Sequence, residues 1–184
     1  MIDPAHILWS QRGSERAGRP LLVMMHGWSY DETHLFSFAD GLPRDLVVAS
    51  VRARQAEEGG FAWFPSRGNP IGNPQPSVAA AAAEMVLRWL DTLAESPQIG
   101  LLGFYQGGAV ALQLERFAHA VNVADFVVDD EQPGDDKLAL LRPPVFWGRG
   151  ARDGVIPASA LRRARRWMDE HTARRDQALR RARP

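Results

Sequence analysis

Short apolar runs alternate along the chain with segments whose apolar residues recur at helical spacing. Runs such as 21–25 and 46–51 are apolar almost throughout, which is typical of strands buried on both faces of a sheet. The predicted strands are 6–9, 21–25, 46–51, 126–128, 144–148 and one that starts at residue 99, with the first two in a hairpin or side by side, and the predicted helices start near residues 35, 77, 109 and 157. This alternation predicts an α/β fold with a mainly parallel, doubly wound sheet.

The stretch 99–112 is the most informative part of the pattern. It predicts a buried strand, a sharp turn with Gly103 and Gly107 on either side of Tyr105, and a helix that opens after Gly108. Glycines are needed here if the central residue occupies a strained turn that leaves no room for neighbouring Cβ atoms. Such a turn directs the central side chain, Tyr105, out above the sheet.

Composition narrows the class of protein. The 184 residues fit one domain over 1–184, and a formal net charge of zero gives no indication of a nucleic-acid partner. Neither a membrane span nor a signal peptide is indicated, and the chain has no cysteine for disulfides, thiolate catalysis or cysteine-based metal sites. These features favour a cytoplasmic protein.

Four motifs together resemble those of a known family. In order along the chain they are His26-Gly27-Trp28 after a strand, Phe61-Ala62-Trp63-Phe64-Pro65 in a loop, the Gly103–Gly108 turn, and the segment Pro144–Pro157. This order is similar to that of the carboxylesterase/phospholipase family of α/β-hydrolases, which includes the acyl-protein thioesterases. The resemblance covers about residues 20–170 and implies an α/β-hydrolase fold, with hydrolysis of carboxylic esters or thioesters by a Ser–Asp–His triad without a cofactor.

The resemblance also assigns roles to particular residues. It places the nucleophile at Tyr105, in the turn known as the nucleophile elbow, and the triad acid at Asp153. It implies an oxyanion hole made by the backbone N–H groups of Trp28 and Gln106. The implied substrate cleft contains His26, Gly27, Trp63 and Phe64.

Two departures from the family pattern bear on catalysis. Tyr105 stands where the family has serine, and a phenol with an ordinary pKa near 10 is hard to deprotonate at pH 7. The family histidine normally follows one further strand in a Gly-His segment, which this chain lacks. His171 is the only histidine after Asp153, so it is the sole candidate base in family order. Its helical spacing with Trp167 favours a different interpretation, a histidine packed at the end of an amphipathic helix.

The C-terminal segment predicts an incomplete sheet. Residues 172–184 are polar and contain no apolar run, so we expect the last strand and helix of the fold to be missing and the tail to be disordered. The many arginines between 162 and 183 are interpreted as the polar face of a helix followed by a disordered end, as a polyanion-binding patch, or as a tail read out of frame. Without the last strand, the strand 145–147 would be an exposed edge, which a homodimer could cover by pairing edge to edge.

Two functions remain open at this point. One is a carboxylic ester or thioester hydrolase acting on a small ester or acyl-bearing substrate, with Tyr105 and the missing histidine unexplained. The other is a catalytically inactive protein of the same fold, which binds a ligand or partner through the same cleft. No cofactor is expected. No metal is expected either, because the histidines lack ligand spacing and the acidic loop 129–136 lacks the EF-hand pattern.

Overall fold

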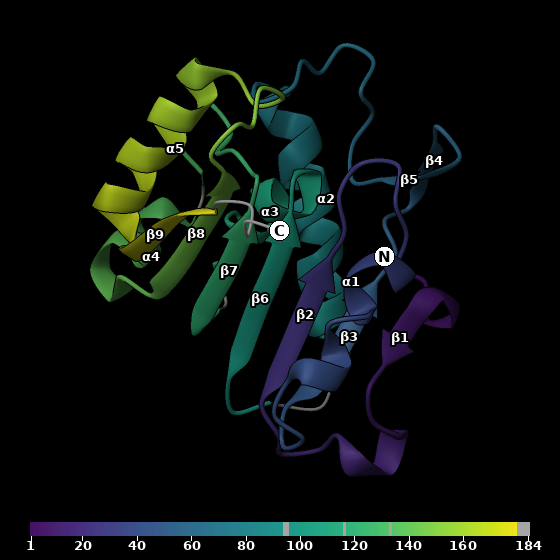
Figure 1. Cartoon of the computed structure of the whole chain (residues 1–184). Helices are drawn as coiled ribbons and strands as arrows, with labels where there is room; N and C mark the ends of the chain where they lie inside the picture. The colour runs from purple at the N-terminus through teal and green to yellow at the C-terminus, as the bar shows by residue number, and fades with distance from the viewer. Residues whose placement is uncertain (94–95, 116, 133, 180–184) are drawn as a thin grey trace, which may run out of the picture.

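A computed structural model describes residues 1–93, 96–115, 117–132 and 134–179. Its centre is a seven-stranded sheet in the order β1-β3-β2-β6-β7-β8-β9, in which β1 is antiparallel to β3 and every other pairing is parallel (Figure 1). The strands are β1 (Ile7–Trp9), β2 (Leu21–Met25), β3 (Val47–Val51), β6 (Ile99–Phe104), β7 (His119–Val123), β8 (Pro144–Gly150) and β9 (Ala173–Leu179). The predicted α/β architecture with a mainly parallel sheet is confirmed.

Helices flank this sheet on its two faces (Figure 1). The α-helices are α1 (Thr33–Phe36), α2 (Pro76–Leu90), α3 (Gln106–Ala111), α4 (Asp135–Leu141) and α5 (Ala158–His171), and short 3-10 turns are η1 (Pro4–His6), η2 (Gly13–Glu15) and η3 (Ala39–Gly41). Successive side chains of β2 point to opposite faces of the sheet and pack in two different clusters. Val23 and Met25 join the large core with α2, α3 and α5, whereas Met24 packs against Leu35 of α1 in a smaller cluster.

Three sequence predictions are corrected in detail. The strands at 6–9 and 21–25 form no hairpin and are not neighbours, because β1 pairs with β3. Residues 126–128 form no strand, and β7 lies earlier, at His119–Val123, although the 126–128 side chains are buried as expected. The segment 61–65, which we expected to be a loop, begins within β5 (Gly60–Ala62), which pairs with β4 (Gln55–Glu57) in a separate two-stranded sheet.

The prediction that the last strand is missing is wrong. Residues 173–179 form β9, which pairs in parallel with β8 along its whole length, from Pro144–Ala173 to Gly150–Leu179. Its sequence lacks an apolar run because it is the outermost strand, where backbone pairing on one side suffices and charged residues are tolerated. The edge of β8 is therefore covered within the chain, and the reason given for an edge-to-edge homodimer falls away. The last helix and residues 180–184 of the tail lie outside the described residues.

None of the described helices is both long and apolar enough to cross a membrane.

Candidate functional site

Tyr105 occupies the sharp turn between β6 and α3. Its φ of 54° and ψ of −113° lie outside the regions that non-glycine residues normally adopt. The N–H of Tyr105 donates to the carbonyl of Val123 at the end of β7, at 3.2 Å, and its own carbonyl accepts from Ala109 in α3. These bonds hold Tyr105 in this strained conformation at the carboxyl edge of the sheet.

Three glycines allow α3 to approach the sheet closely. A Cβ on Gly107 would lie 2.2 Å from the carbonyl oxygen of Met25, and one on Gly103 would lie 2.4 Å from Cα of Gly108. A Cβ on Gly108 would lie 2.5 Å from Cβ of Asp125. Packing alone therefore requires these glycines, whatever side chain stands at position 105.

Gln106 ties the turn to the loop that carries Trp63 and Phe64. Its buried side-chain amide accepts from the N–H of Trp63 and donates to the carbonyl of Phe64, both at 3.0 Å. The indole N–H of Trp63 in turn donates to the carbonyl of His26, at 2.8 Å. The predicted cleft residues are thus brought together by one chain of buried hydrogen bonds.

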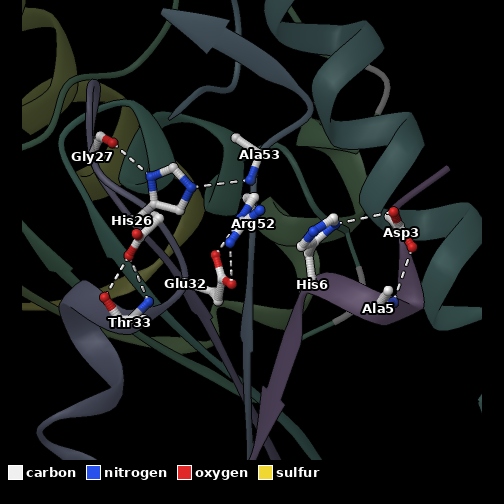
Figure 2. A network of polar contacts seen from close by, with 10 residues as sticks. Asp3, Ala5, His6, His26, Gly27, Glu32, Thr33, Arg52 and Ala53 are labelled. Carbon is white, nitrogen blue, oxygen red and sulfur yellow. Dashed lines mark hydrogen bonds and ion pairs between the residues drawn. The ribbon is translucent and has the colours of Figure 1, made fainter. Parts of the chain in front are cut away.

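His26 is fixed by hydrogen bonds to both of its ring nitrogens, as Figure 2 shows. Nε2 accepts from the N–H of Ala53 at 3.0 Å, so the ring proton lies on Nδ1, which donates to the carbonyl of Gly27 at 2.7 Å. Burial lowers the pKa of His26 and keeps the imidazole neutral. His26 therefore shapes the Gly27–Trp28 loop and has no free nitrogen for acid–base chemistry.

The Gly27–Trp28 loop lies against Tyr105. A Cβ on Gly27 would be 3.4 Å from Cβ of Tyr105. Within the described residues, the backbone N–H groups of Trp28 and Gln106 donate to no protein acceptor. Two backbone donors are therefore left unsatisfied beside Tyr105.

A small cleft of about 80 Å³ adjoins the Tyr105 side chain. Four of its wall residues are predicted site residues, namely Trp28, Phe64, Tyr105 and Gln106. The other five were not assigned to the site from the sequence, and they are Ser66, Asn69, Pro70, Ile71 and Phe126. The Tyr105 ring packs edge-on against the buried Phe126, with centroids 5.9 Å apart. Phe126 was recognisable from the sequence only as an apolar residue, whereas its position in the cleft depends on the tertiary fold.

The environment of Tyr105 disfavours its ionised form. Burial raises the pKa of the phenol, and the negative charge of Asp153 raises it further. Activation of a nucleophile requires the opposite shift or an adjacent base. Tyr105 is therefore predominantly a neutral phenol at pH 7.

Asp153 lies at the same edge of the sheet, three residues beyond the end of β8. Its Oδ1 accepts from the N–H of Val155 at 2.8 Å and stabilises the turn that leads into α5. No described residue links the Asp153 carboxylate to a histidine.

His171 lies at the end of the sheet where the parallel strands begin, opposite to the carboxyl ends that carry Tyr105. It ends α5 two residues before Ala173, which pairs with the first residue of β8, Pro144. The seven residues of β8 separate the two edges by about 20 Å. The His171 ring stacks on Trp167 at 4.8 Å, and its Nδ1 lies 2.7 Å from the Trp167 carbonyl. The structure therefore supports the packing interpretation and does not bring this candidate base to Tyr105.

The other histidines are also engaged elsewhere. His6 pairs with Asp3 at 3.0 Å, His34 stacks on Tyr30 at 3.8 Å, and His119 is exposed at the start of β7, on the amino edge. Among the described residues, no histidine forms a hydrogen bond with Tyr105 or Asp153, and no three acidic or histidine side chains are grouped to hold a metal ion.

A buried carboxyl group behind the turn was missed by the sequence analysis. Asp125 is fully buried and accepts from the indole N–H of Trp147 at 2.6 Å and from the Asn122 amide at 2.7 Å. Burial raises the pKa of Asp125 to about 7. No local sequence pattern distinguishes it from the acidic residues that follow in the loop.

Comparison with solved structures identifies the fold. The chain has a TM-score of 0.76 to the Bacillus cereus carboxylesterase, with 16% identity over 97% of this chain and 87% of that one. It has a TM-score of 0.69 to acyl-protein thioesterase 2 from Zea mays, with 16% identity over 97% and 92%. The chain has the α/β-hydrolase fold. Esterase PE8 is similar as well, with a TM-score of 0.65 and 22% identity over 96% and 88%.

Sequence comparison adds nothing to this result. No family model matches the chain, and no curated protein matches it significantly. The likeness to carboxylesterases, thioesterases and phospholipase/carboxylesterase members therefore concerns the α/β-hydrolase fold. The chemistry has to be argued from the residues at the turn.

Proposed function

We propose that this protein binds a small carboxylic ester, or the corresponding carboxylate, beside Tyr105 and does not hydrolyse it. The observation that carries the proposal is the state of position 105. A neutral phenol with a raised pKa occupies the nucleophile elbow, and no described histidine contacts it. An acyl-transfer nucleophile needs a base within hydrogen-bond reach, and the turn offers none.

The binding groups of the proposed site are those of an ester hydrolase. The N–H groups of Trp28 and Gln106 have no protein acceptor, and they would donate to a ligand carbonyl or carboxylate oxygen. Phe64, Ile71 and Phe126 supply apolar walls for a short acyl or alcohol group. Asp153, which orients the histidine in a triad, here forms side-chain hydrogen bonds within its own turn and, among the described residues, to no histidine.

A hydrolase with a tyrosine nucleophile is the second candidate. Two observations favour it. Tyr105 has the strained backbone of a nucleophile turn with α3 packed closely against the sheet, and the fold is similar to that of carboxylesterases. In this reaction the phenolate oxygen would attack the ester carbonyl and become acylated while the alcohol leaves. The raised pKa of Tyr105 opposes its first step.

Titration with p-nitrophenyl acetate separates these functions. We expect a saturable shift of the Trp28 indole resonance in NMR spectra, without release of p-nitrophenol above the rate in buffer. Tyr105→Phe should behave alike, because the phenolic hydroxyl has no chemical task. Tyr105→Ser should also remain inactive, because a serine would still lack its base. A burst of p-nitrophenol with acetylated Tyr105 in the mass spectrum would establish the tyrosine nucleophile instead, and the absence of any shift would refute binding.

A further inference from the structure

A second cavity lies at the edge of the sheet opposite to Tyr105. Its volume is about 210 Å³, and its walls include the first residues of β2 and β3, Leu21 and Val47, and the last residue of β1, Trp9. The turn after α2 adds Thr92 and Leu93. The cavity is thus separated from the Tyr105 cleft by the length of the sheet.

Arg16 supplies the positive charge of this cavity. Its guanidinium carbon lies 3.8 Å from the centroid of the Trp9 ring, and its Nε donates to the carbonyl of Gln11 at 2.9 Å. In the part of the chain that the structure describes, its two terminal nitrogens bond to no acceptor and Arg16 forms no ion pair. The neighbouring Glu15 instead accepts from the backbone N–H of Arg12.

A partly buried cation without a carboxylate partner favours an anionic ligand. Burial lowers the pKa of Arg16, which means that the charged guanidinium is destabilised by the loss of water. A carboxylate matches the two terminal nitrogens of a guanidinium in a bidentate arrangement. The stacking on Trp9 already fixes the plane of the group, so little side-chain freedom remains to be lost on binding.

The rest of the wall restricts the anion further. Leu21, Val47 and Leu93 form apolar surface that suits a hydrocarbon body. The C-terminal end of α2, which precedes Thr92, carries a partial negative charge that opposes any anion, and it opposes a dianion such as a phosphate monoester more strongly than a singly charged carboxylate. The volume is below the range of about 300–1,000 Å³ that is usual for drug-sized ligands.

We propose that the Trp9–Arg16 cavity binds a small organic monocarboxylate, with its apolar body against Leu21, Val47 and Leu93 and its carboxylate on the terminal nitrogens of Arg16. This site is independent of the function proposed for Tyr105. It assigns a ligand to the amino edge of the sheet, where α/β proteins do not usually bind their substrates.

Benzoate is the probe, and the indole N–H resonances report where it binds. Trp9→Phe identifies the Trp9 signal among those of the chain's six tryptophans. We expect a saturable shift of the Trp9 signal at millimolar benzoate, whether or not the Trp28 signal beside Tyr105 also moves. Benzyl alcohol, which has a similar shape but no charge, should bind at least 10-fold more weakly.

Two variants test the two halves of the proposed site. Arg16→Gln should weaken benzoate binding by about 10-fold or more, as expected for loss of a hydrogen-bonded ion pair, whereas Arg12→Gln, at an exposed arginine outside the cavity walls, should leave it unchanged. Leu93→Phe should reduce binding by filling the cavity while Arg16 stays in place. An equal affinity for Arg16→Gln would overturn the proposal. So would a shift confined to Trp28 and Trp63, or one that does not saturate.

Discussion

The turn around Tyr105 and the C-terminal unit 153–179 belong to the same fold, but different kinds of contact hold them in place. At the turn, three glycines let α3 pack closely against the sheet, and the buried side-chain amide of Gln106 bonds to the backbone of Trp63 and Phe64. The C-terminal unit completes the sheet with β9, and α5 is held mainly by packing of Trp167 and Met168. The first region forms the glycine-lined turn that the sequence predicted, whereas the described part of the second supplies Asp153 but brings no histidine to hydrogen-bond with Tyr105.

An intact turn of this kind is therefore evidence of close packing before it is evidence of catalysis. The glycines are required because backbone atoms of Met25 and Gly108 occupy the space of a Cβ. That requirement is the same with serine or tyrosine at position 105. Chemistry has to be judged from the nucleophile and its base, and these are the two features that depart from the hydrolase pattern.

The variant that disrupts the turn itself should lower the free energy of unfolding most. Gly107→Ala places a Cβ 2.2 Å from the Met25 carbonyl oxygen, so the backbone of α3 or β2 must shift to accommodate it. We expect the free energy of unfolding to fall by at least about 3 kcal/mol, as in severe overpacking. Gly154→Ala, where nothing lies within 4 Å, is the matched control and should change it by less than about 0.5 kcal/mol. Urea denaturation measures both variants, and similar values for the two would contradict the steric argument.

The next effect concerns Asp125, which lies directly behind the turn. Its pKa is about 7 in the folded state against an ordinary value of 3.8, so the folded protein holds this proton more tightly than the unfolded chain does. The stability that this group contributes is complete below about pH 4 and is lost as the pH rises to about 7, by an amount on the order of 4 kcal/mol.

Asp125→Asn should remove that part of the pH dependence, because an amide does not titrate. Denaturation midpoints between pH 4 and pH 8 measure the slope. Asp40→Asn, at an exposed position, serves as the control and should retain the wild-type slope. If the Asp125→Asn slope were also unchanged, the Asp125 carboxyl would not be the titrating group.

A smaller effect is expected where the turn meets the Trp63 loop. Gln106→Ala leaves the N–H of Trp63 and the carbonyl of Phe64 without partners, which should cost about 2 kcal/mol. Gln113→Ala, in the segment just after α3, removes only one long contact to the Ala109 carbonyl at 3.4 Å and should cost much less. Thermal unfolding compares the two variants. Loosening of the loop should also appear as a shifted Trp63 indole resonance in Gln106→Ala alone.

The smallest effect lies in the C-terminal unit. His171→Ala removes the stack on Trp167 and should lower the stability by about 1 kcal/mol. It should leave ligand binding beside Tyr105 unchanged, because His171 lies at the other edge of the sheet. A loss of p-nitrophenyl acetate binding in a folded His171→Ala protein would mean that this region communicates with the cleft after all.

The residue pattern along the chain predicted the α/β class and the strand–turn–helix at Tyr105, whereas the neighbourhood of His26, Trp63 and Gln106 was implied by the resemblance to a known family. Local spacing is enough for the α/β class and the turn, because apolar runs, helical periodicity and glycines in a sharp turn are properties of neighbouring residues. The remaining features depend on contacts between residues far apart in the sequence. The strand β9 has no apolar pattern, since an outer strand is held by backbone pairing with β8. The position of His171 depended on the direction in which α5 crosses the sheet, and the burial of Asp125 depended on contacts from α3 and β8 that no local pattern records.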